Sequence, residues 1–280
     1  MNILLVGVGL IGGSFALSLK KDEQLKFGGY DIDAKNLEEA KKLGIITELF
    51  NDQEEAINWA DTILLAIPVN AIKGWLKGNL SKLRKDQLVV DFGSTKGAIC
   101  ESVEDHPNRS QYLSAHPIAG TEHSGASAAF ASLYEGMNLI ICDEEKTDPT
   151  LSSAFEKLAV AAGFYLTKMD SKEHDRHLAY ISHLSHITSY VLSNTVLNKE
   201  KDGEIILELA GSGFASTVRL AKSSPAMWSA IFTENKDMVL NGIQAYREEL
   251  EKLESMISAN SKDEISAYLE EGRKIRKILK

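Results

Sequence analysis

The fold is decided by the stretch Ile3-Leu4-Leu5-Val6-Gly7-Val8-Gly9-Leu10-Ile11-Gly12 near the start of the 280-residue chain. Its apolar first half predicts a buried strand that ends in a tight turn at Gly7. Gly9 lets the backbone come close to a pyrophosphate, and Gly12 lets the next helix pack against the strand. That helix begins with Leu10 and Ile11, and its free N–H groups and positive dipole end favour phosphate. The stretch therefore predicts a dinucleotide-binding turn.

An acidic residue follows at the spacing that such a turn requires. Gly29-Tyr30-Asp31 ends the second predicted strand, about twenty residues after the turn, where a carboxylate hydrogen-bonds a ribose 2′-hydroxyl. Asp31 would repel a 2′-phosphate, so we expect NAD as the cofactor, with NADP kept open because Lys35 is close in sequence. A Gly-rich turn in an ordinary α/β protein is the alternative, but strand, spacing and acid together favour the dinucleotide site.

Composition narrows the classes of partner. Apolar residues make up 44% of the chain and charged residues 25%, as in soluble globular proteins with room for two domains. The net charge of −9 argues against a nucleic-acid partner and means that an anionic substrate needs local cations. Cys100 and Cys142 form neither a disulfide framework nor a metal-ligand spacing, which predicts a cytoplasmic protein. No apolar run reaches membrane length, and no signal peptide precedes the first strand, so we expect no membrane association.

Strand and helix patterns alternate up to residue 170 and then give way to helices alone. We predict strands at 2–7, 27–31, 62–67, 87–91, 111–115, 138–142 and 163–168, and helices at 10–21, 34–43, 70–83, 124–134 and 150–162. Continuous apolar strands between helices predict a parallel sheet covered on both faces. Long helices are predicted at 171–198, 203–222, 225–258 and 261–279, with Ser171 as the first N-cap.

The predicted fold is therefore α/β, with two domains. Residues 1–170 form a Rossmann dinucleotide-binding domain, and residues 171–280 form an all-helical domain. The apolar faces of these helices are longer than one Rossmann domain needs to cover, so we expect a homodimer that forms through them.

Polar residues follow three predicted strands at the edge of the sheet where ligands bind. Pro68 follows strand 62–67, Ser94 and Lys96 follow strand 87–91, and His116 follows strand 111–115. A neutral imidazole with a pKa near 6.5 can take a proton from a hydroxyl while hydride leaves the same carbon. Ser94 and Lys96 could place a hydroxyl and a cation beside a nicotinamide. The alternatives are a strand-end histidine bonded to its loop and a serine that caps the next helix.

Two further clusters lie in the helical half. Ser182, His183 and His186 share one helix face, and the absence of a compact carboxylate pattern argues against a metal site, so we expect none. Histidines of a core or an interface are the alternative. Arg219 follows a Gly-rich turn and could bind a carboxylate through its planar fork. From position alone, however, a surface salt bridge is the more common role for such an arginine.

Together these clusters resemble the prephenate/arogenate dehydrogenases of tyrosine biosynthesis. The resemblance runs through Gly7 to Ser14, Gly29 to Asp33, Asp91 to Lys96, His116 to Gly125, Leu133 to Gly136, Ser182 to His186 and Arg219 to Trp228. The segment His-Pro-Ile-Ala-Gly-Thr-Glu at 116–122 is its most specific part. The resemblance implies a Rossmann domain with a helical dimerisation domain. It also implies NAD(P)⁺-dependent oxidation of the C4 hydroxyl of a dianionic substrate, with loss of the ring carboxylate as CO₂.

The resemblance also implies roles for individual residues. His116 would be the base on the hydroxyl, with Ser94 as its hydrogen-bonding neighbour. Arg219 would hold a substrate carboxylate, and His186, with Ser182 and His183, would face the side-chain end. Two positions depart from the family pattern. Ser185 stands where the family often has proline, and Ser216 lies where it often has an acid.

Several functions stay open at this point. We favour NAD-dependent conversion of prephenate to 4-hydroxyphenylpyruvate, because His186 as a donor suits a pyruvyl group. Arogenate dehydrogenase, which acts on an amino side chain, is the first alternative. A β-hydroxyacid dehydrogenase shares the Gly-rich turn but depends on a helical lysine and lacks the His116 loop. A non-catalytic dinucleotide sensor would not need His116, Ser94 and Arg219 together.

Overall fold

The computed structural model describes residues 1–121, 123–201 and 207–278. Its strands are β1 (Asn2–Val6), β2 (Lys26–Tyr30), β3 (Glu48–Leu49), β4 (Thr62–Leu65), β5 (Leu88–Asp91), β6 (Tyr112–Pro117), β7 (Asn138–Cys142) and β8 (Tyr165–Met169). They form one sheet in the order β3-β2-β1-β4-β5-β6-β7-β8. The predicted strands are confirmed to within a few residues, and only the two-residue β3 was not predicted.

The sheet carries an apolar core on each face. Ile3 and Leu5 belong to one buried cluster and Leu4 and Val6 to the other, as the alternation of side chains along a strand requires. The covering helices are α1 (Leu10–Ser18), α2 (Ala34–Lys42), α3 (Gln53–Trp59), α4 (Val69–Asn79), α5 (Gly97–Glu101) and α6 (Pro149–Ala161). The short helices α3 and α5 were not predicted.

Two predictions about the edge of the sheet were wrong. β7 pairs antiparallel with β6, so the sheet is not wholly parallel. The predicted helix at 124–134 is only the short 3₁₀ turn η3 (Ala126–Ala128). The two errors have one cause, because a parallel return from β6 needs a crossover of a dozen or more residues, usually helical. Without such a helix, β7 returns beside β6 in the opposite direction.

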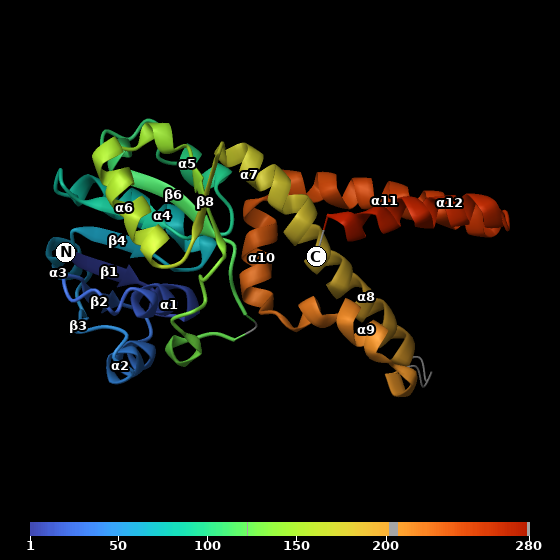
Figure 1. Cartoon of the computed structure of the whole chain (residues 1–280), viewed down its shortest axis with the longest axis horizontal. Helices are drawn as coiled ribbons and strands as arrows, with labels where there is room; N and C mark the ends of the chain where they lie inside the picture. The colour runs from blue at the N-terminus through green and yellow to red at the C-terminus, as the bar shows by residue number, and fades with distance from the viewer. Residues whose placement is uncertain (122, 202–206, 279–280) are drawn as a thin grey trace.

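The second half of the chain is helical, as predicted (Figure 1). Its elements are α7 (Ser171–Leu178), the π-helical turn η5 (Ala179–His183), α8 (Leu184–Lys201), η6 (Leu207–Leu209), α9 (Ser212–Thr217), η7 (Arg219–Lys222), α10 (Pro225–Glu234), α11 (Lys236–Ser258), α12 (Lys262–Gly272) and η8 (Arg273–Lys277).

Three details of the helical half differ from prediction. The N-cap of α7 is Asp170, not Ser171, because the Asp170 carboxylate accepts from the N–H groups of Lys172 and Glu173. The predicted helix 225–258 is broken at Asn235, between α10 and α11. Of the predicted helix 203–222, residues 203–206 lie outside the described residues, and the rest is divided into short pieces around Gly211.

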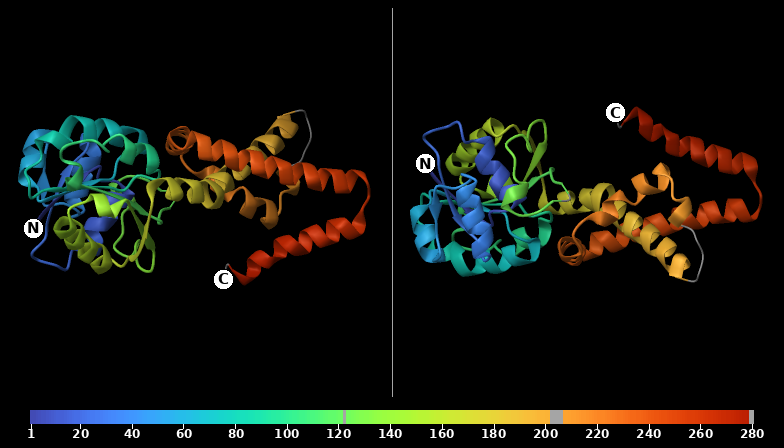
Figure 2. Two further views of the ribbon diagram at one scale, coloured as in Figure 1. Left: turned by 90° about the horizontal axis from the view of Figure 1, so that it is seen from above. Right: turned by 90° about the horizontal axis from the view of Figure 1, so that it is seen from below.

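The helical half packs on the sheet domain through α10, which contacts α4. Trp228 and Ile231 are buried in the same apolar cluster as Trp75 of α4. Lys73 of α4 and Glu234 of α10 form an ion pair with an N–O distance of 2.6 Å. In Figure 2, α11 runs away from this junction, and α12 turns back from the far end of α11 at an angle to it. No helix of the described residues combines the length and apolarity needed to cross a bilayer.

Candidate active site

The carboxyl edge of the sheet meets α7 at a chain of three hydrogen-bonded side chains. His116, the penultimate residue of β6, places Nδ1 2.8 Å from Nε2 of His174 on α7. Nδ1 of His174 lies 2.8 Å from Oδ1 of Asp175. The backbone N–H groups of Lys96 and Gly97 each donate to the Asp175 carboxylate at 2.8 Å. Residues from both halves of the chain thus build one network.

The partners in this chain define the tautomer of each imidazole. A carboxylate only accepts, so Nδ1 of His174 carries a proton and donates it to Asp175. Nε2 of neutral His174 is then an acceptor, and His116 donates to it through Nδ1. Nε2 of neutral His116 is therefore unprotonated. No described residue bonds to it, so the network leaves it as a proton acceptor.

Burial keeps both imidazoles neutral. The pKa of His116 lies well below its ordinary value, first because the ring is desolvated and then because His174, Lys96 and His183 lie near it. Burial also lowers the pKa of His174, although Asp175 acts in the opposite direction. The unperturbed value near 6.5 therefore does not apply to His116, and the base form persists to a lower pH.

The Lys96 ammonium is enclosed between β5 and β6 and does not reach the surface of the sheet edge. Its side chain is fully buried, and Nζ bonds the Asp91 carboxylate and donates to the Ala115 carbonyl oxygen at 2.8 Å. The Tyr112 hydroxyl donates to the other carboxylate oxygen of Asp91 at 2.5 Å. This ammonium group holds β5 and β6 together directly before His116, which corrects its predicted place.

Ser94 lies half-buried in the loop between β5 and α5. Its hydroxyl has no hydrogen-bond partner among the residues that the structure describes. Lys96, not Ser94, is the N-cap of α5, so the alternative role as a helix cap is wrong.

The predicted histidine cluster surrounds Trp228. His186 stacks on the indole with ring centroids 3.5 Å apart, and the His183 ring lies at 6.0 Å. His183 is buried, its Nδ1 lies 3.3 Å from Nδ2 of Asn235, and desolvation lowers its pKa to about 4. Ser182 contributes its carbonyl oxygen, which lies 3.0 Å from Nδ1 of His186. Burial, partly offset by that contact, lowers the pKa of His186.

Arg219 lies at the start of η7 and is exposed. Its charge contributes to the lowered pKa of His186, so the two side chains lie near each other. Within the described ranges, Arg219 makes no ion pair. Its guanidinium is therefore available to an anion. The two departures from the family pattern lie close by: the Ser185 hydroxyl donates to the Ile181 carbonyl at 3.3 Å, and Ser216 is exposed.

The Gly-rich turn has the geometry that its sequence predicts. Gly7 has a φ of +88°, and a Cβ there would lie 2.5 Å from the Ala66 carbonyl oxygen. A Cβ at Gly12 would lie 2.5 Å from the Gly7 carbonyl oxygen, whereas one at Gly9 would meet nothing within 4 Å. Gly9 therefore presents bare backbone to open space. No side chain caps α1, which begins at Leu10, so its first N–H groups are left for a ligand.

The acid of the predicted cofactor site lies beside this turn. The Asp31 carboxylate accepts from the N–H of Val8 at 3.0 Å and of Asp33 at 2.9 Å. Pro68 is the exposed N-cap residue of α4, three residues after the end of β4. The carbonyl oxygen of Ile11 accepts from the Tyr134 hydroxyl at 2.6 Å. These positions fit a dinucleotide laid over the edge of the sheet.

Both halves of the chain match models of one protein family. Residues 15–163 match the model of the prephenate dehydrogenase nucleotide-binding domain, and residues 170–271 match that of the prephenate dehydrogenase dimerization domain. The chain belongs to the prephenate dehydrogenase family. The predicted family, the fold class and the assignment as an enzyme of this oxidoreductase family are thereby confirmed.

Individual members of the prephenate dehydrogenase family are similar along the whole chain. Prephenate dehydrogenase of Bacillus subtilis is 31% identical over 98% of this chain and 75% of that protein. The crystal structure of prephenate dehydrogenase from A. aeolicus in complex with hydroxyphenyl propionate and NAD⁺ superimposes with a TM-score of 0.94, at 32% identity, over 100% of this chain and 98% of that one. Arogenate dehydrogenase of Synechocystis gives a TM-score of 0.83 at 28% identity, and 99% of each chain is covered.

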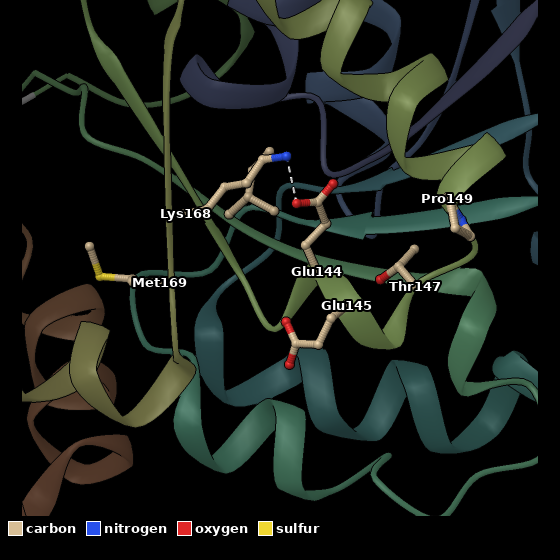
Figure 3. Close-up of a pocket in the computed structure, with 7 residues that line it drawn as sticks. Glu144, Glu145, Thr147, Pro149, Lys168 and Met169 are labelled. Atoms are coloured by element: carbon tan, nitrogen blue, oxygen red, sulfur yellow. Dashed lines mark ion pairs between the residues drawn. The ribbon is translucent and has the colours of Figure 1, made fainter.

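One cavity of the structure lies away from the predicted site residues. It has a volume of about 430 Å³ and is lined by Ile141, Glu144, Glu145, Thr147, Pro149, Lys168 and Met169 (Figure 3). Lys168 pairs with Glu144 at 2.6 Å and with Glu156 at 2.7 Å. The predicted site residues do not line it, and its carboxylates would repel a dianion. A second hollow, of about 660 Å³, lies on the segment after β6 and is lined by Thr121, His123, Ser124, Ser127, Ala128 and Phe130.

Proposed function

We propose that the protein catalyses the NAD⁺-dependent oxidative decarboxylation of prephenate to 4-hydroxyphenylpyruvate. The observation that carries the proposal is the chain Asp175–His174–His116, which leaves Nε2 of His116 as a proton acceptor at the ligand-binding edge of the sheet. A dinucleotide sensor needs no such base. The similarity to the B. subtilis and A. aeolicus prephenate dehydrogenases supports the same reaction.

NAD is the cofactor of the proposed reaction. Gly7, Gly9 and Gly12 shape the turn for a pyrophosphate, which the N–H groups at the start of α1, from Leu10 and Ile11, would hold. Asp31 would accept the ribose 2′-hydroxyl, and Pro68 would border the cleft from β4. When bound, the nicotinamide accepts a hydride. NAD⁺ in the A. aeolicus structure supports this assignment.

His116 acts on the C4 hydroxyl of the ring. Its Nε2 takes the hydroxyl proton while the C4 hydride departs, and Ser94 hydrogen-bonds the same oxygen. The bond from the ring to its carboxylate breaks and CO₂ leaves. The bonding electrons complete the aromatic ring and leave the C4 oxygen as a phenolate, to which His116 returns the proton. The proton on His116 is stabilised because Nδ1 already donates toward His174 and Asp175. Aromatisation supplies the driving force, so the residues mainly orient the groups.

The helical half holds the substrate in this proposal. Arg219 binds one carboxylate of the dianion through paired N–H donors, and its exposure leaves it free to do so. His186 faces the side-chain end, stacked on Trp228, and Ser182 and His183 set its position from the preceding turn. The net charge of −9 makes such a local cation necessary.

A second candidate substrate is arogenate. Nδ1 of His186 faces the Ser182 carbonyl oxygen and must donate to it, so Nε2 of the neutral ring is an acceptor. An acceptor suits the ammonium of an amino side chain better than the keto oxygen of a pyruvyl group. This observation runs against the expectation that His186 donates to the substrate. The arogenate dehydrogenase of Synechocystis supports the alternative.

We further propose a homodimer that works in the cytoplasm. Large apolar side chains are exposed along α8, α11 and α12, among them Val191, Leu240, Leu250, Ile257 and Leu269. A second copy of the chain would cover them, and the match to a dimerization domain supports this assembly. Cys100 and Cys142 are buried free thiols, as a reducing compartment allows. An active monomer in light scattering at assay concentrations would refute the dimer.

A crossed assay tests the proposed function. Prephenate and arogenate are each incubated with NAD⁺ and with NADP⁺, and reduced nicotinamide is measured at 340 nm. We expect turnover with prephenate and NAD⁺, and lower efficiency with NADP⁺. Higher efficiency with arogenate would support the second candidate. Turnover in none of the four mixtures would overturn the proposal and favour a sensor.

A further inference from the structure

Asn36 is a half-buried side chain whose hydrogen bonds join three separate parts of the predicted cofactor site. Its Nδ2 donates to the Val8 carbonyl oxygen at 3.1 Å and to Oδ2 of Asp31 at 2.9 Å. Its Oδ1 accepts from the N–H of Ala126 at 2.8 Å. The amide uses both N–H groups and its oxygen, so its orientation is fixed by its surroundings.

The contact with Ala126 attaches the segment that follows His116. Gly125, with a φ of +87°, turns the chain so that the Ala126 N–H faces Asn36. A few residues later, the N–H of Phe130 donates to the buried Ser14 hydroxyl of α1 at 3.1 Å, and the Tyr134 hydroxyl donates to Ile11. Residues 125–134, which we call the strap, are therefore fastened to α1 and α2 beside the Gly-rich turn.

The contact with Asp31 sets the direction of the carboxylate. Oδ2 of Asp31 accepts from both Val8 and Asn36, whereas Oδ1 accepts only from the N–H of Asp33 among the described residues. Oδ1 therefore keeps an acceptor site for one more donor, such as a ribose 2′-hydroxyl.

We propose that Asn36 is a positioning residue for the dinucleotide: it holds Oδ1 of Asp31 toward the ribose and ties the strap to the Gly-rich turn. This inference rests on the proposed use of NAD. Asn36 acts through Asp31 and the strap and needs no contact of its own with the cofactor. Its loss should weaken nucleotide binding and change the discrimination between a 2′-hydroxyl and a 2′-phosphate.

Two substitutions separate the two contacts. Asn36→Ala removes these two contacts and the one to the Val8 carbonyl, so the strap loosens and Asp31 loses one of its donors. Asn36→Asp keeps an oxygen for the Ala126 N–H but places a second negative charge beside Asp31. Asn58→Ala is the matched control, because Asn58 is an exposed helical asparagine of α3 whose side chain makes no hydrogen bond within the described part of the chain.

The test is a fluorescence titration of each full-length variant with NADH and with NADPH, beside thermal melts that establish folding. We expect Asn36→Ala to raise the Kd for NADH roughly tenfold, the size of one lost charge-assisted hydrogen bond. Its Kd for NADPH should rise less, because NADPH never used the 2′-hydroxyl contact. In Asn36→Asp, the Kd for NADPH should rise more than the Kd for NADH, because the added charge repels the 2′-phosphate. Asn58→Ala should match the parent.

The outcomes distinguish this inference from the proposed function. If the parent binds NADH and both Asn36 variants bind it within twofold of the parent, Asn36 has no positioning role. The same conclusion follows if the ratio of the two Kd values is equal in all four proteins. A parent that binds neither nucleotide overturns the use of NAD and this inference together. If Asn36→Ala fails to fold, Asn36→Asp alone decides through the ratio.

Discussion

The two ends of the proposed active site are built in opposite ways. At the base end, His116, His174 and Asp175 are joined by contacts of 2.8 Å, and backbone N–H groups from α5 fix the carboxylate. At the anchoring end, Arg219 is exposed and, within the part of the chain that the structure describes, unpaired. A group that moves a proton gains from being preorganised, since its geometry sets the barrier. A group that captures an anion is better left hydrated and free until the anion arrives.

This contrast predicts different kinetic signatures for the two ends. Damage at the base end should lower kcat, because the lost interaction belongs to the transition state. Damage at the anchoring end should raise KM for the organic substrate, because it binds ground state and transition state alike.

The largest effect is expected for His116→Asn. The change keeps a hydrogen bond to His174 but removes the proton acceptor, so kcat should fall by roughly 10²–10⁴-fold with little change in either KM. In the parent, the acidic limb of kcat/KM should lie below pH 6.5, because burial lowers the pKa of His116 and the neutral form is the active one. The limb should be absent in the variant. If His116→Asn keeps the parental kcat and the parental acidic limb of kcat/KM, the base is another group.

Asp175→Asn tests whether the base end works as a unit. An amide can donate to Nδ1 of His174, which reverses both tautomers and places a proton on Nε2 of His116. We expect kcat to fall by about 10²-fold, with KM for NAD⁺ unchanged. Asp170→Asn, in the same helix, retains its N-cap role and should keep the parental kcat. Equal kcat values in the two variants would show that His116 needs no support from α7.

The sequence predicts those features of this site that depend on residues close together in the chain. The Gly-rich turn, Asp31 and His116 are defined by neighbours within a few residues of a strand, so spacing locates them. His174 lies 58 residues from His116 and meets it only because α7 crosses the carboxyl edge of the sheet. The signal was present as His174 and Asp175 in the first helix after the sheet, but nothing local to that helix places it against His116.

Lys96 and β7 were mispredicted for a related reason. Asp91 is an acid in an otherwise apolar strand, and a buried carboxylate requires a cation, which the nearby Lys96 supplies. That requirement outweighs any role at the surface of the cleft. The direction of β7 depends on the path of the preceding connection, which residue patterns within β7 do not encode.

Arg219→Lys and Arg219→Ala probe the anchoring end. Lysine keeps the charge but loses the planar fork, so both variants should raise KM for the dianion, alanine more. Loss of the contact costs about 2 kcal/mol, or roughly 30-fold in KM. KM for NAD⁺ should stay constant and kcat should change less. Arg273→Lys, at an exposed arginine of η8, serves as the control. An unchanged KM in both Arg219 variants would place the anchor elsewhere, with Lys222 as the next candidate.

The smallest effect concerns stability and involves His183, which lies between the two ends. Burial lowers its pKa to about 4, and Nδ1 accepts from Asn235 in the folded state. In the unfolded chain the ordinary value is 6.5, so below that pH the unfolded state binds more protons than the folded state. The free energy of unfolding should therefore fall as the pH drops from 6.5 toward 4, by at most about 1.4 kcal/mol per pH unit for one proton.

Thermal melts at pH 7, 6 and 5 and constant ionic strength measure this slope. Tm of the parent should fall with pH, and His183→Gln should show a shallower fall because glutamine does not titrate. His177→Gln is the matched control, since His177 is exposed on α7 and its replacement should leave the parental slope. His116, His174 and His186 also have lowered pKa values, so some slope should survive in His183→Gln. Identical slopes in the parent and in His183→Gln would mean that His183 takes up protons equally in the folded and unfolded states, so that burial between the two ends does not lower its pKa.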